Sequence, residues 1–312
     1  MGRLTNTLSW SLSRQQMFGE CRRQYYLHYY RSWGGWEDGA EPVARLTYRL
    51  KQIVNLDLWT GALLHRLIEG QLARLRRGFR PAANPLCEQA RSLLNQEWRQ
   101  SVEQRWRENP KHNVNLFEHY YGIEIGDQRR ADLREKLFAC LDHFCALPLL
   151  ERLVAAEPNA WLAVEQLDTF LVDRVPVYVK LDCAVQLDGR TLIIDWKSGR
   201  ASERDLAQIA CYGLYAMQKW RTGFENLRTL LVYLLANETA EQPIGPEQAL
   251  AMQERIVSGI QAMREVLADP IANVAREEDF PKTNQLHRCR RCNFHEICYG
   301  PGPIAPAGTS TD

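Results

Sequence analysis

The sequence predicts an α/β protein in which a mixed central β-sheet is flanked by helices. Residues before about 158 have sequence patterns typical of helices, whereas those from about 160 are rich in β-branched and aromatic side chains. A helical segment at about 203–220 then separates two strand-like runs, which is typical of strands joined by a packed helix. We therefore expect one domain over residues 1–300.

Helices dominate the first half of the chain. Ser11 or Ser13 is available as the N-cap of the first helix, and the glycine-rich residues 32–39 interrupt the pattern. The expected helical segments are residues 9–30, 46–77 and 86–155. Residues from about 40 to 158 should thus form a helical section that precedes the sheet at about 159–240.

Four strand-like runs follow, at residues 160–172, 175–187, 191–197 and 228–235. Asp188-Gly189 is a strong hairpin signal, because both residues tolerate the positive φ of a type I′ turn. Alternate residues of the run before this turn should share one buried face, namely Val177, Val179, Leu181, Cys183, Val185 and Leu187. A last helix is expected at about 246–268, ahead of a cysteine-rich segment at 280–299.

The predicted hairpin brings two carboxylates together. A two-residue loop sets Asp182 directly opposite Asp195 and Lys180 opposite Lys197, unless a bulge shifts the register. Facing like charges destabilise a sheet, and a divalent cation such as Mg²⁺ or Mn²⁺ would remove that penalty. The alternative is a solvated edge where lysines neutralise the aspartates, but the apolar neighbours of Asp195 favour the metal site.

A metal ion between these carboxylates has a direct chemical use. It can polarise a scissile phosphate and lower the pKa of a bound water. Lys197, two residues after Asp195 on the same strand face, could orient or deprotonate that water or offset charge in the transition state. Asp182, Asp195 and Lys197 are therefore the candidate catalytic residues.

The strand–turn–strand sequence "KLDCAVQLDGRTLIIDWKSG" resembles the D…D-x-K core of the PD-(D/E)xK nucleases, in particular their RecB-like branch. The resemblance implies a restriction-endonuclease-like fold and a deoxyribonuclease that uses Mg²⁺ or Mn²⁺. Asp182, Asp195 and Lys197 match the metal-binding and catalytic positions of that core.

Further motifs extend the resemblance over nearly the whole chain. "GALLHRLIEG" is similar to the G-x3-H-x3-E pattern of the branch and implies that His65 is an additional metal ligand. "DLAQIACYGLYA" is similar to its Q-x3-Y motif, and the resemblance implies that Gln208 and Tyr212 position the DNA strand. Glu165 resembles a position on the first core strand that contributes to the metal environment, whereas Glu69 is expected to be structural.

Three cysteines near the end of the chain suggest a second metal site. Cys289, Cys292 and Cys298 have the spacing C-x2-C-x5-C, but tetrahedral zinc and a cubane cluster both need four ligands. Members of the branch that carry an iron–sulfur cluster have one more cysteine near the N-terminus, which implies Cys21 and a [4Fe-4S] cluster; zinc is the rival occupant. The remaining cysteines are expected to be small buried residues.

Such a cluster would join the two ends of the domain. By the chain-entropy model used for disulfides, closing a loop of this length stabilises the fold by roughly 5 kcal/mol. The residues after Cys21 mix aromatic side chains with arginines, which suits stacking on a single strand, although helix packing would use the same aromatics. Residues 301–312 are rich in Pro, Gly, Ser and Thr and are expected to be disordered.

The favoured function is a metal-dependent exonuclease acting from DNA ends, with single-stranded DNA or single-stranded ends as substrate. The formal net charge of +1 excludes no partner, because basic residues can collect on one face. The candidate settings are CRISPR adaptation, recombination or repair, and antiphage defence. In these settings the protein would act with other proteins of a DNA-processing complex. The alternatives are an end-binding or end-measuring subunit with little activity and a zinc-stapled scaffold.

A cytoplasmic location is expected. The chain has no apolar run near the roughly 20 residues that span a membrane, and its first residues lack the apolar stretch of a secretion signal. Nine cysteines in that compartment indicate metal binding or burial rather than disulfides.

Overall fold

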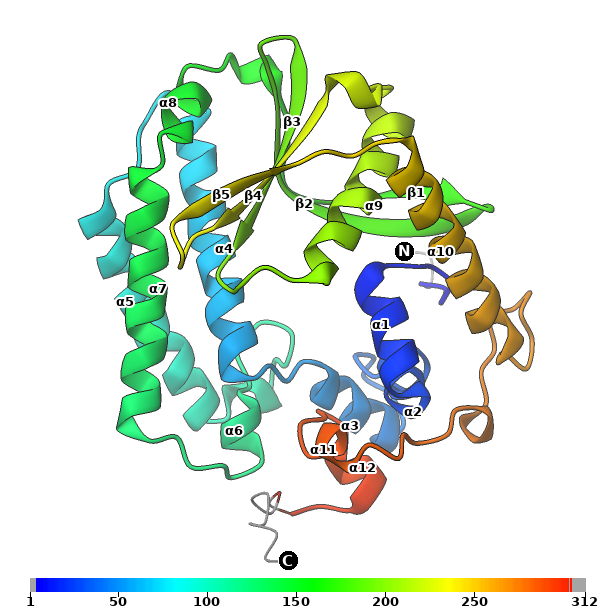
Figure 1. Cartoon of the computed structure of the whole chain (residues 1–312). Coiled ribbons are helices and arrows are strands. Elements are labelled where there is room, and N and C mark those ends of the chain that lie inside the picture. The colour runs from blue at the N-terminus through cyan, green and yellow to red at the C-terminus, as the bar shows by residue number, and fades with distance from the viewer. Residues whose placement is uncertain (1–3, 303, 305–312) are drawn as a thin grey trace, which may run out of the picture.

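A computed structural model describes residues 4–302 and 304, and this part of the chain contains a central five-stranded sheet (Figure 1). The strands lie in chain order, with β3 and β4 parallel and every other neighbouring pair antiparallel. They are β1 (Trp161–Val172), β2 (Val175–Leu187), β3 (Arg190–Lys197), β4 (Leu227–Tyr233) and β5 (Glu238–Gln242). The predicted mixed α/β sheet is confirmed; the short polar edge strand β5 was not predicted.

The β2–β3 hairpin forms with the predicted register. Asp188 and Gly189 have φ values of 52° and 74°, as a type I′ turn requires, and Leu187 pairs with Arg190. The paired ladder ends at Cys183 and Ile194, one residue short of Asp182 and Asp195. The expected facing pair of lysines, at positions 180 and 197, therefore does not form.

The prediction of a single buried face along β2 is wrong around Asp182. Leu181 and Ala184 belong to one core cluster, whereas Cys183 belongs to the other, so the alternation changes phase there. On the neighbouring strand, opposite this point, Glu165 has a φ of 45° between two regular pairs. An L-residue in this conformation bends the strand locally, and irregular strands are common next to active sites.

Helices cover both faces of the sheet (Figure 1). On one face, α9 (Glu203–Trp220) connects β3 to β4 and packs with α10 (Pro246–Glu265) in the larger core cluster. The other face packs against a second cluster, supplied by α4 (Leu56–Leu75), α5 (Ala83–Val102), α7 (Asp127–Ala146) and α8 (Leu149–Val154). The central strands thus lie between two apolar layers.

Two expected long helices are each broken in the structure. The first becomes α1 (Leu12–Glu20) and α2 (Arg22–Tyr26), followed by a π-helical turn, with Cys21 at the break and Ser11 as the N-cap. The second becomes α3 (Pro42–Lys51) and α4, because the Asn55 side chain accepts a hydrogen bond from Leu58 N (2.8 Å) and starts a new helix.

The two ends of the domain meet. Short helices α11 (Leu286–Cys289) and α12 (His295–Tyr299) lie beside α2 and α3, and α6 (Phe117–Tyr120) is close by (Figure 1). Arg23 holds the C-terminal segment through its backbone N to Pro281 O (3.1 Å) and its side-chain Nε to Phe280 O (2.7 Å).

The segment before α1 runs along β2. Trp10 N donates to Pro176 O (2.9 Å), and Tyr178 N donates to Trp10 O (2.8 Å). This segment occupies the half of β2 that β3 does not reach. Over the described residues, the structure has no helix with the length and hydropathy needed to cross a membrane. The expected disorder of residues 301–312 falls mostly outside the described part of the chain.

Candidate active site

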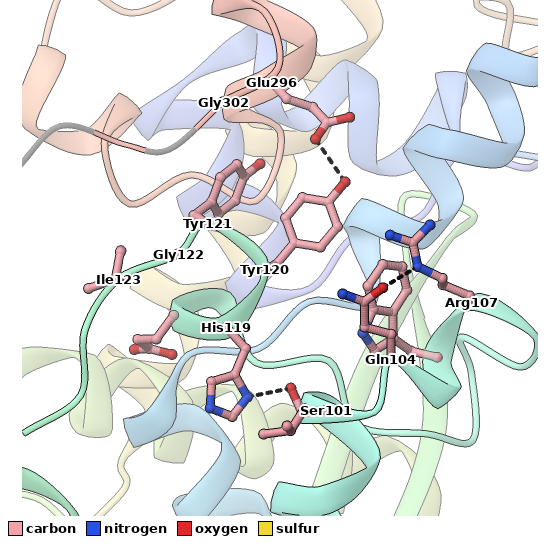
Figure 2. Close-up of a pocket in the computed structure, with 13 residues that line it drawn as sticks. Ser101, Gln104, Arg107, His119, Tyr120, Tyr121, Gly122, Ile123, Glu296 and Gly302 are labelled. Carbon is pink, nitrogen blue, oxygen red and sulfur yellow. Dashed lines mark hydrogen bonds between the residues drawn. The ribbon is translucent and has the colours of Figure 1, made fainter. Parts of the chain in front are cut away.

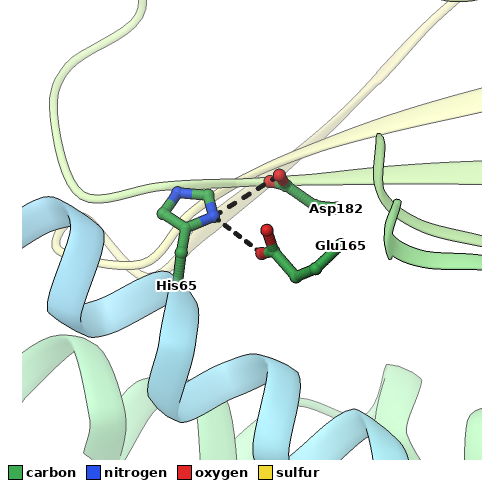
Figure 3. A group of neighbouring side chains, drawn as sticks. All are labelled: His65, Glu165 and Asp182. Atoms are coloured by element: carbon green, nitrogen blue, oxygen red, sulfur yellow. Dashed lines mark hydrogen bonds and ion pairs between the residues drawn. The ribbon is translucent and has the colours of Figure 1, made fainter. Parts of the chain in front are cut away.

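His65, Glu165 and Asp182 form a compact group of metal-ligand type (Figure 3). His65 Nδ1 lies 3.1 Å from Glu165 Oε1 and 3.4 Å from Asp182 Oδ1. One ligand atom from each residue falls within 4.8 Å of the other two. The three residues come from α4, β1 and β2, so the site depends on the packing of the helical section against the sheet.

Backbone and lysine contacts hold the two carboxylates of this group. Asp182 Oδ2 accepts a hydrogen bond from Trp196 N (2.9 Å), an amide that the end of the β2–β3 ladder leaves available. Glu165 Oε2 lies 2.6 Å from Lys180 Nζ. Both carboxylates are almost entirely buried, which fixes their rotamers and removes competing water.

Asp195 and Lys197 form an adjoining ion pair on β3. Lys197 Nζ lies 2.7 Å from Asp195 Oδ2 and also donates to Gln208 Oε1 (2.8 Å). Asp205, near the start of α9, adds a second carboxylate at 3.4 Å. The Lys197 amine is thereby directed at the carboxylates instead of solvent.

Tyr212 links this ion pair to β2. Its hydroxyl donates to Lys180 O (2.6 Å), lies 3.3 Å from Asp195 Oδ1, and forms a further hydrogen bond with Gln208. Tyr212 is only 2% exposed, so its hydroxyl is fixed between Lys180 O and the Asp195–Lys197 ion pair. The DNA-positioning role implied for Gln208 and Tyr212 remains a prediction.

The charges in the site are strongly coupled. Burial opposes protonation of His65, but its hydrogen bonds to Asp182 and Glu165 outweigh this and raise its pKa to about 10. Burial, followed by the nearby charge of Asp182, raises the pKa of Asp195 to about 6 despite the Lys197 ion pair. The pKa of Glu165 is lowered, since His65 and Lys180 together overcome the effect of burial.

The residues present fit a divalent cation. Buried carboxylate oxygens are the donors that Mg²⁺ and Mn²⁺ prefer, and the imidazole favours Mn²⁺ slightly. The predicted ligands His65 and Asp182 are brought together, and Glu165 joins them more closely than the sequence indicated. Asp195 lies next to this group, since the charge of Asp182 reaches it, but pairs with Lys197.

Sequence reasoning missed two contributors. Lys180 balances Glu165, and Asp205 contacts Lys197. The position of Asp205 was detectable, because it is the third residue of α9 in a capping box with Ser202. Its contact with Lys197 was not, because it depends on how α9 lies across β3.

The four cysteines predicted to bind a cluster line one small pocket between the chain ends. They are Cys21, Cys289, Cys292 and Cys298. Burial is the main reason that the pKa of Cys292 rises to about 12, and the charges of the other three add to it. The remaining cysteines lie elsewhere, with Cys140, Cys183 and Cys211 buried as expected and Cys87 and Cys145 partly exposed.

The aromatic side chains after Cys21 divide between core and surface. Tyr25 and Tyr26 are buried and stack near Phe280, as helix packing predicts. Trp33 and Trp36 remain 38% and 40% exposed.

The family model of the PD-(D/E)XK nuclease superfamily matches residues 9–299, and the chain belongs to this superfamily. Membership implies a nuclease that acts on DNA with the help of a divalent metal, which agrees with the group of His65, Glu165 and Asp182. A search of curated proteins gives no match.

Proposed function

We propose that this protein is a RecB-like exonuclease that hydrolyses DNA from its ends with Mg²⁺ or Mn²⁺. The observation that carries the proposal is the junction of two sites: the group of His65, Glu165 and Asp182 adjoins the Asp195–Lys197 pair. A metal-binding group alone would suit many hydrolases, but an amine held beside it supplies what phosphodiester cleavage needs.

His65, Glu165, Asp182 and Asp195 would hold the metal. When bound, it supplies Lewis acidity toward a phosphate oxygen. The protein contributes the arrangement of these donors, fixed by Trp196 N on Asp182 and by Tyr212 on Asp195. Binding of a cation would also relieve the repulsion that raises the pKa of Asp195.

Lys197 would act on the attacking water and on the developing phosphate charge. Its ammonium group is 19% exposed and is held by Asp195, Gln208 and Asp205. A cation fixed in this way stabilises negative charge in the transition state without reorganisation. Tyr212 and Gln208 would hold Lys197 and Asp195 in position to act on the scissile phosphate.

A [4Fe-4S] cluster would occupy the cysteine pocket. Four thiols line a single small pocket, and such a set favours a bound metal, because thiolates held this close together need a cationic partner. Zinc meets the same ligand requirement. Iron and sulfide assays on an anaerobic preparation distinguish the two: a brown protein with both elements supports the cluster, and a colourless one with stoichiometric zinc contradicts it.

End-directed cleavage suits CRISPR adaptation, recombination or repair, and antiphage defence, in each case with other proteins of a DNA-processing complex. The second candidate function is an end-binding or end-measuring subunit. The complete set of Asp182, Asp195 and Lys197 supports catalysis over binding alone, because a binder would not need an amine held 2.7 Å from a buried carboxylate.

The test is cleavage of 5′- and 3′-labelled oligonucleotides with Mn²⁺ by the wild type and by Lys197→Ala. We expect Lys197→Ala to lower kcat by about 10²–10³ while DNA binding stays nearly intact. Lys219→Ala, whose lysine pairs with Asp168 away from the site, should cleave normally. A wild type that binds ends but leaves every strand uncut would establish the end-binding alternative.

A further inference from the structure

A groove leads away from the candidate active site along β2. The groove is lined by Tyr178 and Lys180 of β2, by the segment before α1, and by Gln208 and Tyr212 of α9. Its volume is about 640 Å³, within the usual range of ligand-binding clefts. Since Gln208 and Lys180 contact Lys197 and Glu165, the groove is continuous with the active site.

The charge of this groove is one-sided. Of the described residues that line it, four are cationic and none is acidic: Arg14, Lys51, Lys180 and Arg204. The cavity shown in Figure 2, of similar size, is different, because Arg107 shares it with Glu118 and Glu296. Tyr120 and Glu296 in this cavity also bond each other, with the Tyr120 hydroxyl donating to Glu296 Oε2 (2.7 Å).

Three of the four cations in the groove, Arg14, Lys51 and Arg204, have no ion pair with a carboxylate among the described residues, and two of them lie beside one aromatic ring. Within residues 4–302, neither Arg14 nor Lys51 forms an ion pair with a carboxylate; Arg14 instead donates to Ser9 O (2.7 Å) and lies 3.8 Å from the centre of the Tyr29 ring. Lys51 Nζ lies 5.6 Å from the same ring. Buried charges are normally paired, so two unpaired cations around one aromatic ring form a site for an anion.

Electrostatics around Tyr29 agree with this assignment. Burial, and then the charge of Arg14, lowers the pKa of Lys51 to about 8. Burial, followed by Lys51 and Arg14, lowers the pKa of His28 to about 3, so this histidine stays neutral. Among the residues that the structure describes, no carboxylate pairs with either cation, and an anion from outside would relieve their repulsion.

Aromatic side chains line the same groove beside the cations. Tyr178 on its floor is 43% exposed, and Trp33 near Lys51 is 38% exposed. Exposed rings interleaved with cations are the usual platform for single-stranded nucleic acid, because unpaired bases stack on the rings while phosphates meet the cations. In a duplex the base faces are already stacked on one another.

We infer that this groove binds a single DNA strand whose end reaches the active site, with a phosphate of the strand held between Arg14 and Lys51. The inference rests on the proposed nuclease function and specifies the route of its substrate. Tyr178 would stack on a base between the phosphate site and the scissile bond. Lys51 and Tyr178 would thus govern strand affinity and not the chemical step.

The experiment measures binding of a fluorescent single-stranded oligonucleotide in EDTA at several salt concentrations, and cleavage of the same strand with Mn²⁺. The variants are Lys51→Met, the charge-preserving Lys51→Arg, and the control Lys111→Met, whose lysine is exposed outside the groove. One lost phosphate contact lowers the slope of log K against log salt by about 0.7, or roughly fivefold in affinity near 0.1 M salt.

We expect this change for Lys51→Met, with KM raised and kcat nearly unchanged, and near wild-type behaviour for the other two variants. Tyr178→Ala should weaken binding roughly tenfold without changing the salt slope. Because its side chain is half-exposed, this variant decides the matter even if Lys51→Met fails to fold.

Equal binding by Lys51→Met, Lys111→Met and wild type, or no effect of Tyr178→Ala, would overturn the groove assignment. Tighter binding of duplex than of single strands would overturn it as well. Failure of the nuclease function has a separate signature, because a wild type that binds the strand through Lys51 but cuts nothing with Mn²⁺ retains the groove and loses the reaction.

Discussion

The candidate active site and the cysteine pocket each bring together side chains that can bind a metal. The two sites differ in how far apart these side chains lie in the sequence. Glu165, Asp182 and Asp195 lie on three consecutive strands whose pairing brings them together. The cysteine pocket instead joins Cys21 to a segment that begins at Cys289, so only the closure of the whole domain can form it.

This difference separates the roles of the two sites. The active-site carboxylates are held by lysines, a histidine and a backbone amide before any metal binds. In the cysteine pocket, burial raises the pKa of Cys292, which keeps this thiol neutral. Neutral thiols bind one another only weakly unless a metal is present. We expect metal at the strands to matter for the reaction and metal at the cysteines to matter for the fold.

The largest effect is expected at the strands. Asp182→Asn keeps the side-chain volume but removes a metal ligand, so we expect cleavage to fall at least about 100-fold and Mn²⁺ affinity to drop. The melting temperature in EDTA should change little. Calorimetric titration with Mn²⁺ and a labelled-strand assay measure the two effects, and undiminished Mn²⁺ binding would remove Asp182 from the metal site.

The opposite result is expected at the cysteines. Cys292→Ala should lose the brown colour, become less soluble and lose up to roughly 5 kcal/mol of the free energy of unfolding, because the chain ends are no longer joined. Visible absorbance and denaturant titration measure this, with Cys87→Ala as the control outside the pocket. Unchanged absorbance and stability in Cys292→Ala would refute a structural cluster.

Asp195 tests whether a residue that is needed for cleavage lowers the stability of the metal-free protein. Because its pKa in the folded protein is about 6, above that of a free carboxyl, ionised Asp195 destabilises the metal-free fold at neutral pH. Asp195→Asn should therefore raise Tm in EDTA at pH 8 by roughly 2–4 °C while abolishing cleavage.

The sign of this effect sets its pH dependence. Below about pH 6 the folded wild type binds a proton at Asp195 and regains stability, so the difference between the two proteins should shrink as pH falls from 8 to 5. Thermal denaturation across this range provides the measurement. A difference that grows on acidification would show that Asp195 is stabilising when charged.

The smallest effect is expected at Tyr212. Tyr212→Phe removes the hydroxyl that contacts Lys180 O and Asp195, so kcat should fall about tenfold or less with KM for DNA unchanged. Tyr215→Phe is the control on the same helix, since its hydroxyl bonds Asp168 instead. A raised KM with normal kcat would show that Tyr212 positions the strand.

Local patterns in the sequence were sufficient to predict the hairpin. Asp188-Gly189 fixed the turn, and the turn fixed the paired register, which ends at Cys183 and Ile194, one residue short of Asp182 and Asp195. Strand periodicity failed at Asp182, where the buried face of β2 changes opposite the positive φ of Glu165, and nothing in the β2 sequence indicates this change. The expected helix over 46–77 failed because Asn55 was not recognised as a cap.

Contacts in the site between residues far apart in the sequence could not be predicted from periodicity. His65 lies 100 residues from Glu165, and only the resemblance to the nuclease branch pointed to it. The ion pair between Lys180 and Glu165 joins β2 to β1, and periodicity within either strand does not reveal it. The cationic groove needs the segment before α1 to pair with β2, and an isolated bridge at Trp10 has no periodic pattern to reveal it.

The most direct test of the metal site is the Mn²⁺ concentration at which strand cleavage is half-maximal, compared between wild type, Glu165→Gln and Glu69→Gln. Glu69 is the matched control, an exposed glutamate one turn beyond His65 on α4. The buried group of His65, Glu165 and Asp182 predicts a shift of at least about tenfold to higher Mn²⁺ for Glu165→Gln and none for Glu69→Gln. Identical midpoints for all three proteins, or no cleavage by the wild type at any Mn²⁺ concentration, would contradict it.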